Sequence, residues 1–190
     1  MPSVRVERLP VETLNLGRIG FDHLQIVFRS DFAAGSEVQD DWFVIEGIRE
    51  AGAHGTHLAV EGWHGGTTLS EANGWRRGDA LVERIGRPES RHPREIATGA
   101  EAIELWATLV AHAADIHAHK FPYVPVTIPV INSSSLVSSL LHHAGFHVEA
   151  AMPPGLRFSP GRRTLLGRVA GDTRATENGF TAILASVDPS

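Results

Sequence analysis

Three consecutive serines are the residues of this chain best suited to chemistry. Ser133, Ser134 and Ser135 follow Asn132 and precede an apolar helical pattern that begins at Leu136. Backbone N–H groups at a helix N-terminus lack intrahelical acceptors, and the helix dipole favours negative charge there. A serine at this position therefore either caps the helix or acts as a nucleophile beside donors for an oxyanion.

A serine nucleophile needs a base, and His23 is the candidate. In the stretch around it, Leu24, Ile26 and Phe28 share one strand face, which leaves His23 on the other. An imidazole has a pKa near neutrality, so His23 can accept the proton of Ser133 and later return it.

An acidic residue is expected to orient the imidazole, and two candidates follow His23 on predicted strands. These are Glu46 and Glu61. The residues also have structural explanations: Ser133 or Asn132 could simply cap the helix, and His23 could be an ordinary strand histidine. Glu46 and Glu61 could equally be solvated carboxylates at strand ends.

The elements that must position these residues predict an α+β fold with an antiparallel sheet and packed helices. β-Branched and aromatic residues predict strands over residues 21–29, 42–46 and 56–61. The first two form a hairpin with a long loop, and a one-residue slip in their pairing would reverse every face. A last strand is expected over residues 180–187, and strands, helices and strands in succession favour α+β over a parallel sheet.

Two helices are predicted in the second half of the chain. Over residues 98–119, Thr98 and Glu101 have the spacing of a capping box. The expected buried face of this helix consists of Ile103, Trp106, Ala107, Val110, Ala113 and Ala114. The second helix covers residues 133–144, ends before Gly145, and buries Leu136, Val137, Leu140 and Leu141. A short helix over 79–85 and an extended segment over 126–131 are also expected.

Composition indicates one globular domain over residues 1–190, with 42% hydrophobic and 21% charged residues. A net charge of −5 argues against nucleic-acid binding, and the absence of cysteine excludes a thiol nucleophile and disulfides. The N-terminus lacks an apolar signal-peptide region, and no apolar run approaches the roughly 20 residues of a membrane span. We therefore expect a cytoplasmic protein as synthesised, with export by a signal-independent route left open.

Sharper motifs are missing, namely the G-x-S-x-G elbow, the Walker A loop, G-x-G-x-x-G and H-E-x-x-H. The 11 histidines raise the question of a metal site. His112 and His119 lie seven residues apart, about 10 Å along a helix, which is too far for one ion. We expect surface histidines, no metal and no cofactor, with a metal enzyme using His54, His57 and His64 as an alternative.

The order of these motifs resembles that of the circularly permuted papain-like hydrolases. These include the PPPDE peptidases and the lecithin:retinol acyltransferase-like enzymes, and more distantly the NlpC-type cell-wall peptidases. Asp22-His23-Leu24-Gln25-Ile26-Val27 is similar to the family's histidine strand, and Asn132-Ser133-Ser134-Ser135-Leu136-Val137 to its nucleophile segment. Ser133 stands where the family has cysteine. The segment from Asn132 to Leu141, with the Pro160-Gly161 region, also resembles parts of large secreted bacterial toxin-like proteins.

The resemblance implies a hydrolase or acyltransferase acting on a peptide, isopeptide or acyl ester bond. In this reading Ser133 attacks the carbonyl, His23 is the base, and Glu46 or Glu61 orients the imidazole. Backbone N–H groups at the start of the helix are expected to hold the oxyanion. Because serine replaces cysteine, the alternative is a catalytically inactive binding or structural domain of the same fold.

Overall fold

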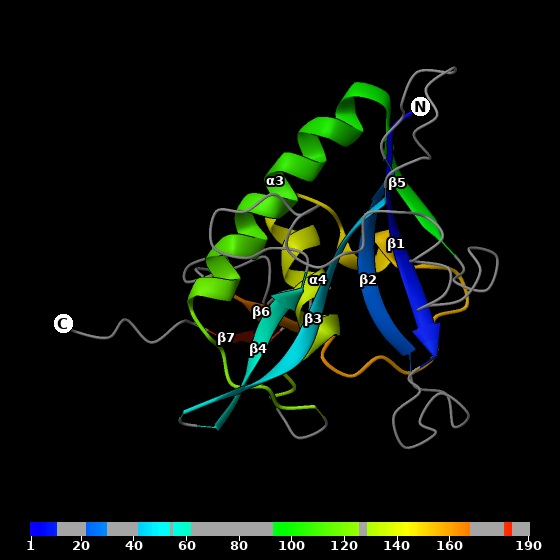
Figure 1. Cartoon of the computed structure of the whole chain (residues 1–190). Coiled ribbons are helices and arrows are strands. Elements are labelled where there is room, and N and C mark those ends of the chain that lie inside the picture. The colour runs from blue at the N-terminus through cyan, green and yellow to red at the C-terminus, as the bar shows by residue number, and fades with distance from the viewer. Residues whose placement is uncertain are drawn as a thin grey trace.

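An antiparallel sheet of five strands, with helices packed against it, forms the framework of this computed structural model (Figure 1). The structure describes residues 1–10, 22–29, 42–53, 55–61, 93–125, 129–167 and 181–183. The strands lie in the order β4-β3-β2-β1-β5. They are β1 (Ser3–Pro10), β2 (Asp22–Arg29), β3 (Trp42–Gly52), β4 (Gly55–Glu61) and β5 (Arg94–Thr98). The expected α+β class with an antiparallel sheet is confirmed.

The predicted hairpin and its third strand are present. Strand β2 pairs antiparallel with β3, with Ile26 opposite Ile45, and β3 pairs antiparallel with β4. Strands β1 and β5 were not expected from the sequence, although Val4 and Val6 alternate with polar residues along β1 and are fully buried. Because β1 pairs with β2 on one side and β5 on the other, it makes β2 a central strand of the sheet.

Helix α3 (Gly99–Ala118) matches the predicted range, but its start differs from the prediction. Thr98 is the N-cap residue, yet its side chain makes no capping hydrogen bond, so the expected capping box with Glu101 is wrong. Gly99 has a φ of +64° and donates its N–H to the carbonyl of Pro2 over 2.8 Å. The left-handed turn at Gly99 and this bond to the N-terminal segment set the entry into the helix instead.

The buried face of α3 is also displaced from the predicted one. The fully or almost fully buried residues are Ala102, Leu109, Ala113 and Ile116, whereas Ile103 is 55% exposed. Trp106 stacks on Phe28 of β2 with ring centroids 5.3 Å apart. Apolar residues lie on several faces of this alanine-rich helix, so contact with the sheet rather than periodicity decides which face is covered.

Helix α4 (Ser133–His143) lies on the same side of the sheet as α3 and contacts β2, β3 and α3 (Figure 1). Its predicted core residues Leu136, Val137, Leu140 and Leu141 are completely buried. The helix ends at His143 with Ala144 as its C-cap residue, after which Gly145 takes a φ of +84° and donates its N–H to the carbonyl of His142. The predicted stop at Gly145 is confirmed, and α4 is the central helix of the core.

Shorter elements complete the described chain. These are α5 (Val148–Ala151), β6 (Thr164–Leu166) and β7 (Thr181–Ile183), the last two of which form a small parallel pair. The predicted last strand coincides with β7 over its described part. Ile131, the last residue of the extended segment expected over 126–131, pairs with Val124, which precedes that segment. The expected helix over 79–85 lies outside the described residues. Within the described part of the chain, no helix is both long and apolar enough to cross a membrane.

Candidate active site

The N-terminus of α4 is capped by Asn132, not by Ser133. The Asn132 Oδ1 atom accepts hydrogen bonds from the N–H groups of Ser134 at 2.9 Å and Ser135 at 3.4 Å. In return, the Ser135 Oγ atom accepts the N–H of Asn132 at 2.7 Å, which completes a capping box. The hydroxyl of Ser133 is therefore not needed to cap its own helix.

The hydroxyl of Ser133 also differs from the other serine hydroxyls of α4 in what it contacts. Three of these donate to backbone carbonyls within 2.9 Å: Ser135 to Asn132, Ser138 to Arg162, and Ser139 to Ser135. The hydroxyl of Ser134 lies 2.6 Å from that of Ser159. Ser133 Oγ instead lies 2.8 Å from Nδ1 of His23, so among the described residues it is the serine of this helix that contacts an imidazole.

The other ring nitrogen of His23 contacts Glu46. The distance from Nε2 to the Glu46 Oε2 atom is 2.8 Å, and Glu46 is 7% exposed. When Glu46 is ionised its carboxylate can only accept a hydrogen bond, which assigns the proton of a neutral imidazole to Nε2 and leaves Nδ1 as the acceptor for the Ser133 hydroxyl. Ser133, His23 and Glu46, all predicted as site residues from the sequence, thus form a continuous series of hydrogen bonds in that order.

Strand register explains why Glu46, rather than Glu61, meets His23. Ile26 lies opposite Ile45, so Glu46 falls beside Gln25 and on the same face as His23, one diagonal step along β2. Glu61 pairs with Glu46 on β4, one strand further from β2. The side chain of Glu61 lies outside the described part of the structure, and Glu46 is the acid whose contact with His23 is defined.

The expected set of oxyanion donors is smaller than predicted. The N–H groups of Ser134 and Ser135 already donate to Asn132 Oδ1, so they are not free to donate to an oxyanion beside the Ser133 hydroxyl. Among the described residues, the N–H of Ser133 itself donates no hydrogen bond. That N–H, at the positive end of the α4 dipole, is the backbone donor left beside the Ser133 Oγ atom.

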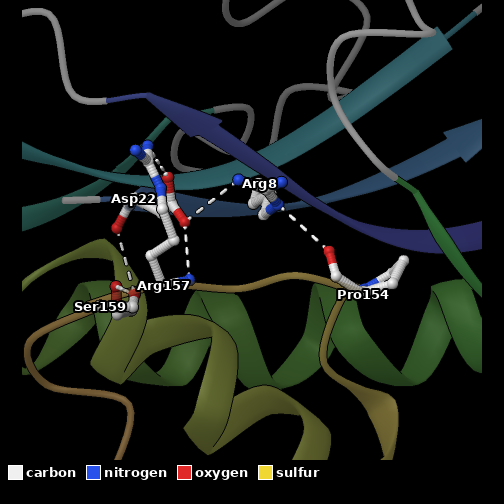
Figure 2. Close-up of polar contacts among 6 residues, drawn as sticks. Arg8, Asp22, Pro154, Arg157 and Ser159 are labelled. Carbon is white, nitrogen blue, oxygen red and sulfur yellow. Dashed lines mark hydrogen bonds and ion pairs between the residues drawn. The ribbon is translucent and has the colours of Figure 1, made fainter. Parts of the chain in front are cut away.

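Asp22, the neighbour of His23, is held by an ion-pair cluster that the sequence did not reveal (Figure 2). Its carboxylate accepts hydrogen bonds from Nη2 of Arg157 at 2.9 Å, from the N–H of Arg157 at 2.9 Å, and from Nη1 of Arg8 at 3.3 Å. Burial alone would raise the pKa of Asp22, but the hydrogen bonds from Arg157 and the charges of Arg157 and Arg8 hold it below its usual value. The start of β2, which carries His23, is thereby fixed to the segment that follows α5.

The histidines proposed as metal ligands do not form a defined site. His54 and His64 lie outside the described residues, and His57 instead pairs with Glu50 over 3.0 Å. In the described part of the chain, no group of three or more side chains is arranged to hold a metal ion. His112 is half-buried rather than on the surface, because its ring stacks on that of His143 with centroids 4.8 Å apart.

Comparison of the chain with protein-family models, curated proteins and solved structures gave no significant match. The resemblance to permuted papain-like hydrolases stays a prediction from the two motifs and the order of elements. The contacts among Ser133, His23 and Glu46 are the observations from which a function can be argued.

Proposed function

We propose that the protein is a serine hydrolase or acyltransferase in which Ser133 is the nucleophile, His23 the general base and Glu46 the orienting acid. One observation carries this proposal: a hydroxyl, an imidazole and a carboxylate in series, with both contacts at 2.8 Å. This is the arrangement by which a nucleophile, its base and an orienting group are recognised. The imidazole of His23 is 24% exposed, so its ring retains an open side for a substrate.

The acylation step follows from the proton positions. The Ser133 Oγ atom attacks the carbonyl carbon as its proton moves to Nδ1 of His23, which gives a tetrahedral intermediate and an imidazolium ion. The Glu46 carboxylate stabilises the imidazolium through Nε2, and the N–H of Ser133 donates to the oxyanion. The intermediate collapses when Nδ1 returns the proton to the leaving amine or alcohol, which leaves an ester on Ser133.

Release of the acyl group uses the same residues in reverse. His23 removes a proton from water, or from an alcohol or amine acceptor, which then attacks the Ser133 ester. The Ser133 Oγ atom leaves and regains its proton from Nδ1. Peptides, isopeptides and acyl esters all fit this chemistry, and water or a second substrate as acceptor separates hydrolysis from acyl transfer.

A permuted papain-like arrangement is part of the proposal. A hairpin carrying the base precedes, by more than a hundred residues, a buried central helix whose first residue is the nucleophile, as the family resemblance implies. In this site Nδ1 faces the nucleophile and Nε2 the acid, the reverse of the serine-protease triad, in which Nε2 faces the serine. An inactive binding domain stays the alternative, since Asn132 caps the helix as one of the structural explanations expected. That cap does not account for the contact of 2.8 Å between Ser133 Oγ and His23 Nδ1, which favours the catalytic role.

Labelling with a fluorophosphonate probe tests the proposal. The wild-type protein is expected to be labelled at Ser133, as located by peptide mass spectrometry, and Ser133→Ala and His23→Ala are expected to remove labelling. Glu46→Gln should lower the labelling rate by about 10²- to 10⁴-fold, since an amide no longer holds the correct tautomer of His23.

A matched control lies on the neighbouring hairpin. His57 and Glu50 form a second imidazole–carboxylate pair at 3.0 Å on the hairpin of β3 and β4. Within the described part of the chain, His57 makes no hydrogen bond to a serine of α4. The variants His57→Ala and Glu50→Gln should therefore label at the wild-type rate. Absence of labelling in folded wild-type protein, or equal loss in the two pairs of variants, would contradict the proposed function and favour a binding domain.

A further inference from the structure

A buried chain of hydroxyls joins the residue after the nucleophile to the residue before the base. The Oγ atoms of Ser134 and Ser159 lie 2.6 Å apart, and the Oγ of Ser159 donates to the carbonyl of Asp22 over 3.1 Å. Ser134, Asp22 and Ser159 are each at most 4% exposed. Helix α4 and strand β2 are thus linked within one residue of Ser133 and His23.

The direction of this chain is fixed by counting hydrogens. A carbonyl can only accept, so the single hydroxyl hydrogen of Ser159 points to Asp22. The hydrogen in the Ser134–Ser159 bond must then come from Ser134. Two hydroxyl donors in sequence polarise each other in a low-dielectric interior, which strengthens the link from the helix to the strand.

The segment that contains Ser159 also makes several hydrogen bonds to Asp22 (Figure 2). The carbonyl of Phe158 accepts the N–H of Asp22 at 2.9 Å, and the N–H of Arg157 donates to the Asp22 carboxylate. Residues 157–159 therefore bind both backbone polar groups and the side chain of Asp22. Within this segment, Ser159 is the residue that also bonds to helix α4, through Ser134.

We propose that Ser159 is a positioning residue that sets the separation between the Ser133 hydroxyl and the His23 imidazole; as a catalytic role, this rests on the proposed function. Ser159 touches neither of the two reacting groups. It acts through their immediate neighbours, Ser134 and Asp22, and a displacement near 1 Å between nucleophile and base is enough to lower a rate by about 10²-fold.

The experiment compares Ser159→Ala with Ser138→Ala. Ser138 is a matched control, since its hydroxyl also bonds α4 to the segment around residues 159–162, by donating to the carbonyl of Arg162 over 2.7 Å. Fluorophosphonate labelling is followed at increasing probe concentration, which separates the maximal rate from probe binding. Ser159→Ala is expected to lower the maximal rate by about 10- to 100-fold with probe affinity unchanged, and Ser138→Ala to leave both near wild type at a similar Tm.

Two further variants support the assignment. Ser134→Ala should lower the maximal rate as well, and the Ser134→Ala, Ser159→Ala double variant should be no slower than Ser159→Ala alone, because both hydroxyls belong to one chain. If Ser159→Ala does not fold, Ser159→Cys, of similar size but with a weak donor, replaces it. A folded Ser159 variant that labels at the maximal rate of wild type overturns the proposal.

An NMR measurement that does not depend on labelling distinguishes failure of this proposal from failure of the proposed function. The ¹⁵N NMR signals of the His23 ring report its hydrogen bonds directly, and Nδ1 is expected to shift in Ser159→Ala but not in Ser138→Ala. An unlabelled wild-type protein whose Nδ1 signal still responds to Ser159→Ala would reject the hydrolase while supporting the positioning role. An unchanged Nδ1 signal in folded Ser159→Ala would reject the positioning role.

Discussion

Gly47 and Ser133 approach so closely that no side chain fits between them. A Cβ atom on Gly47 would lie 2.9 Å from the Ser133 Cα atom and 3.2 Å from its N atom. Gly47 follows Glu46 on β3, so the strand that carries Glu46 also lets the backbone of Ser133 come against the sheet. The two ends of the proposed triad are thereby set by one stretch of β3.

We expect Gly47→Ala to lower the rate of fluorophosphonate labelling by about 10- to 100-fold, because the backbone of Ser133 must move away from β3. Gly52→Ala is the control on the same strand, since its Cβ would meet mainly the His57 side chain, at 3.1 Å, far along β3 from Glu46. The labelling rate and the Tm of both variants are measured. Wild-type labelling by Gly47→Ala would contradict the close approach described here.

Asn132→Ala should lower the free energy of unfolding by about 1 kcal/mol, with a range of roughly 0.5–2 kcal/mol for a lost N-cap. The N–H groups of Ser134 and Ser135 lose their acceptor, and the start of α4 is buried. Asn132→Asp keeps an acceptor oxygen and should retain most of the stability. Urea denaturation measures both, and equal stability of Asn132→Ala and wild type would reject the capping role.

The ion-paired carboxylate of Asp22 should make the folded protein less stable in acid. Its pKa in the folded protein is below the value of 3.8 for the free group, so its contribution to stability is complete above about pH 3.8 and is lost as the pH falls through the lower, folded pKa. The destabilisation caused by Asp22→Asn should therefore be greatest near neutral pH and shrink in acid. Urea denaturation over this pH range checks the trend, which a constant difference would contradict.

The half-buried imidazole of His112 should make the stability of the fold depend on pH over a second, higher pH range. Burial and the charge of His143 lower the pKa of His112 below 6.5, against the opposing charge of Asp115. Below about pH 6.5 the unfolded chain takes up this proton first, so stability falls as the pH drops. His112→Gln should reduce the loss of stability between about pH 7.5 and about pH 5. His147→Gln, at an exposed position, serves as the control and should leave this loss of stability unchanged.

Local sequence was sufficient where the pattern was strong. The hairpin, α4 with its buried leucines, and the stop at Gly145 could be predicted because apolar spacing and a single glycine determine them locally. The face of α3 and the cap at Thr98 could not, because Gly99 and the contact of Pro2 with it depend on where the N-terminal strand lies. Tertiary contacts overrode a correct local spacing in both cases.

The candidate site could be predicted by residue type but not by register. Ser133 and His23 follow from the helix and strand patterns together with the family resemblance, whereas the choice between Glu46 and Glu61 required the pairing of Ile26 with Ile45 across a long loop. Gly47 and Ser159 gave no signal, because their roles come from contacts between segments distant in the chain. Such contacts have no local periodicity that a sequence pattern can display.

The separate hydrogen-bond assignments of the α4 serines have a consequence for chemoselectivity. Three adjacent alcohols at the start of this helix are the same functional group, and all three are nearly inaccessible to solvent. An electrophile that reaches them meets two whose hydrogens are already committed to neighbours in the fold and one whose hydrogen can pass to an imidazole. Discrimination within the run is then a matter of where each proton can go, and not of which oxygen is easiest to reach.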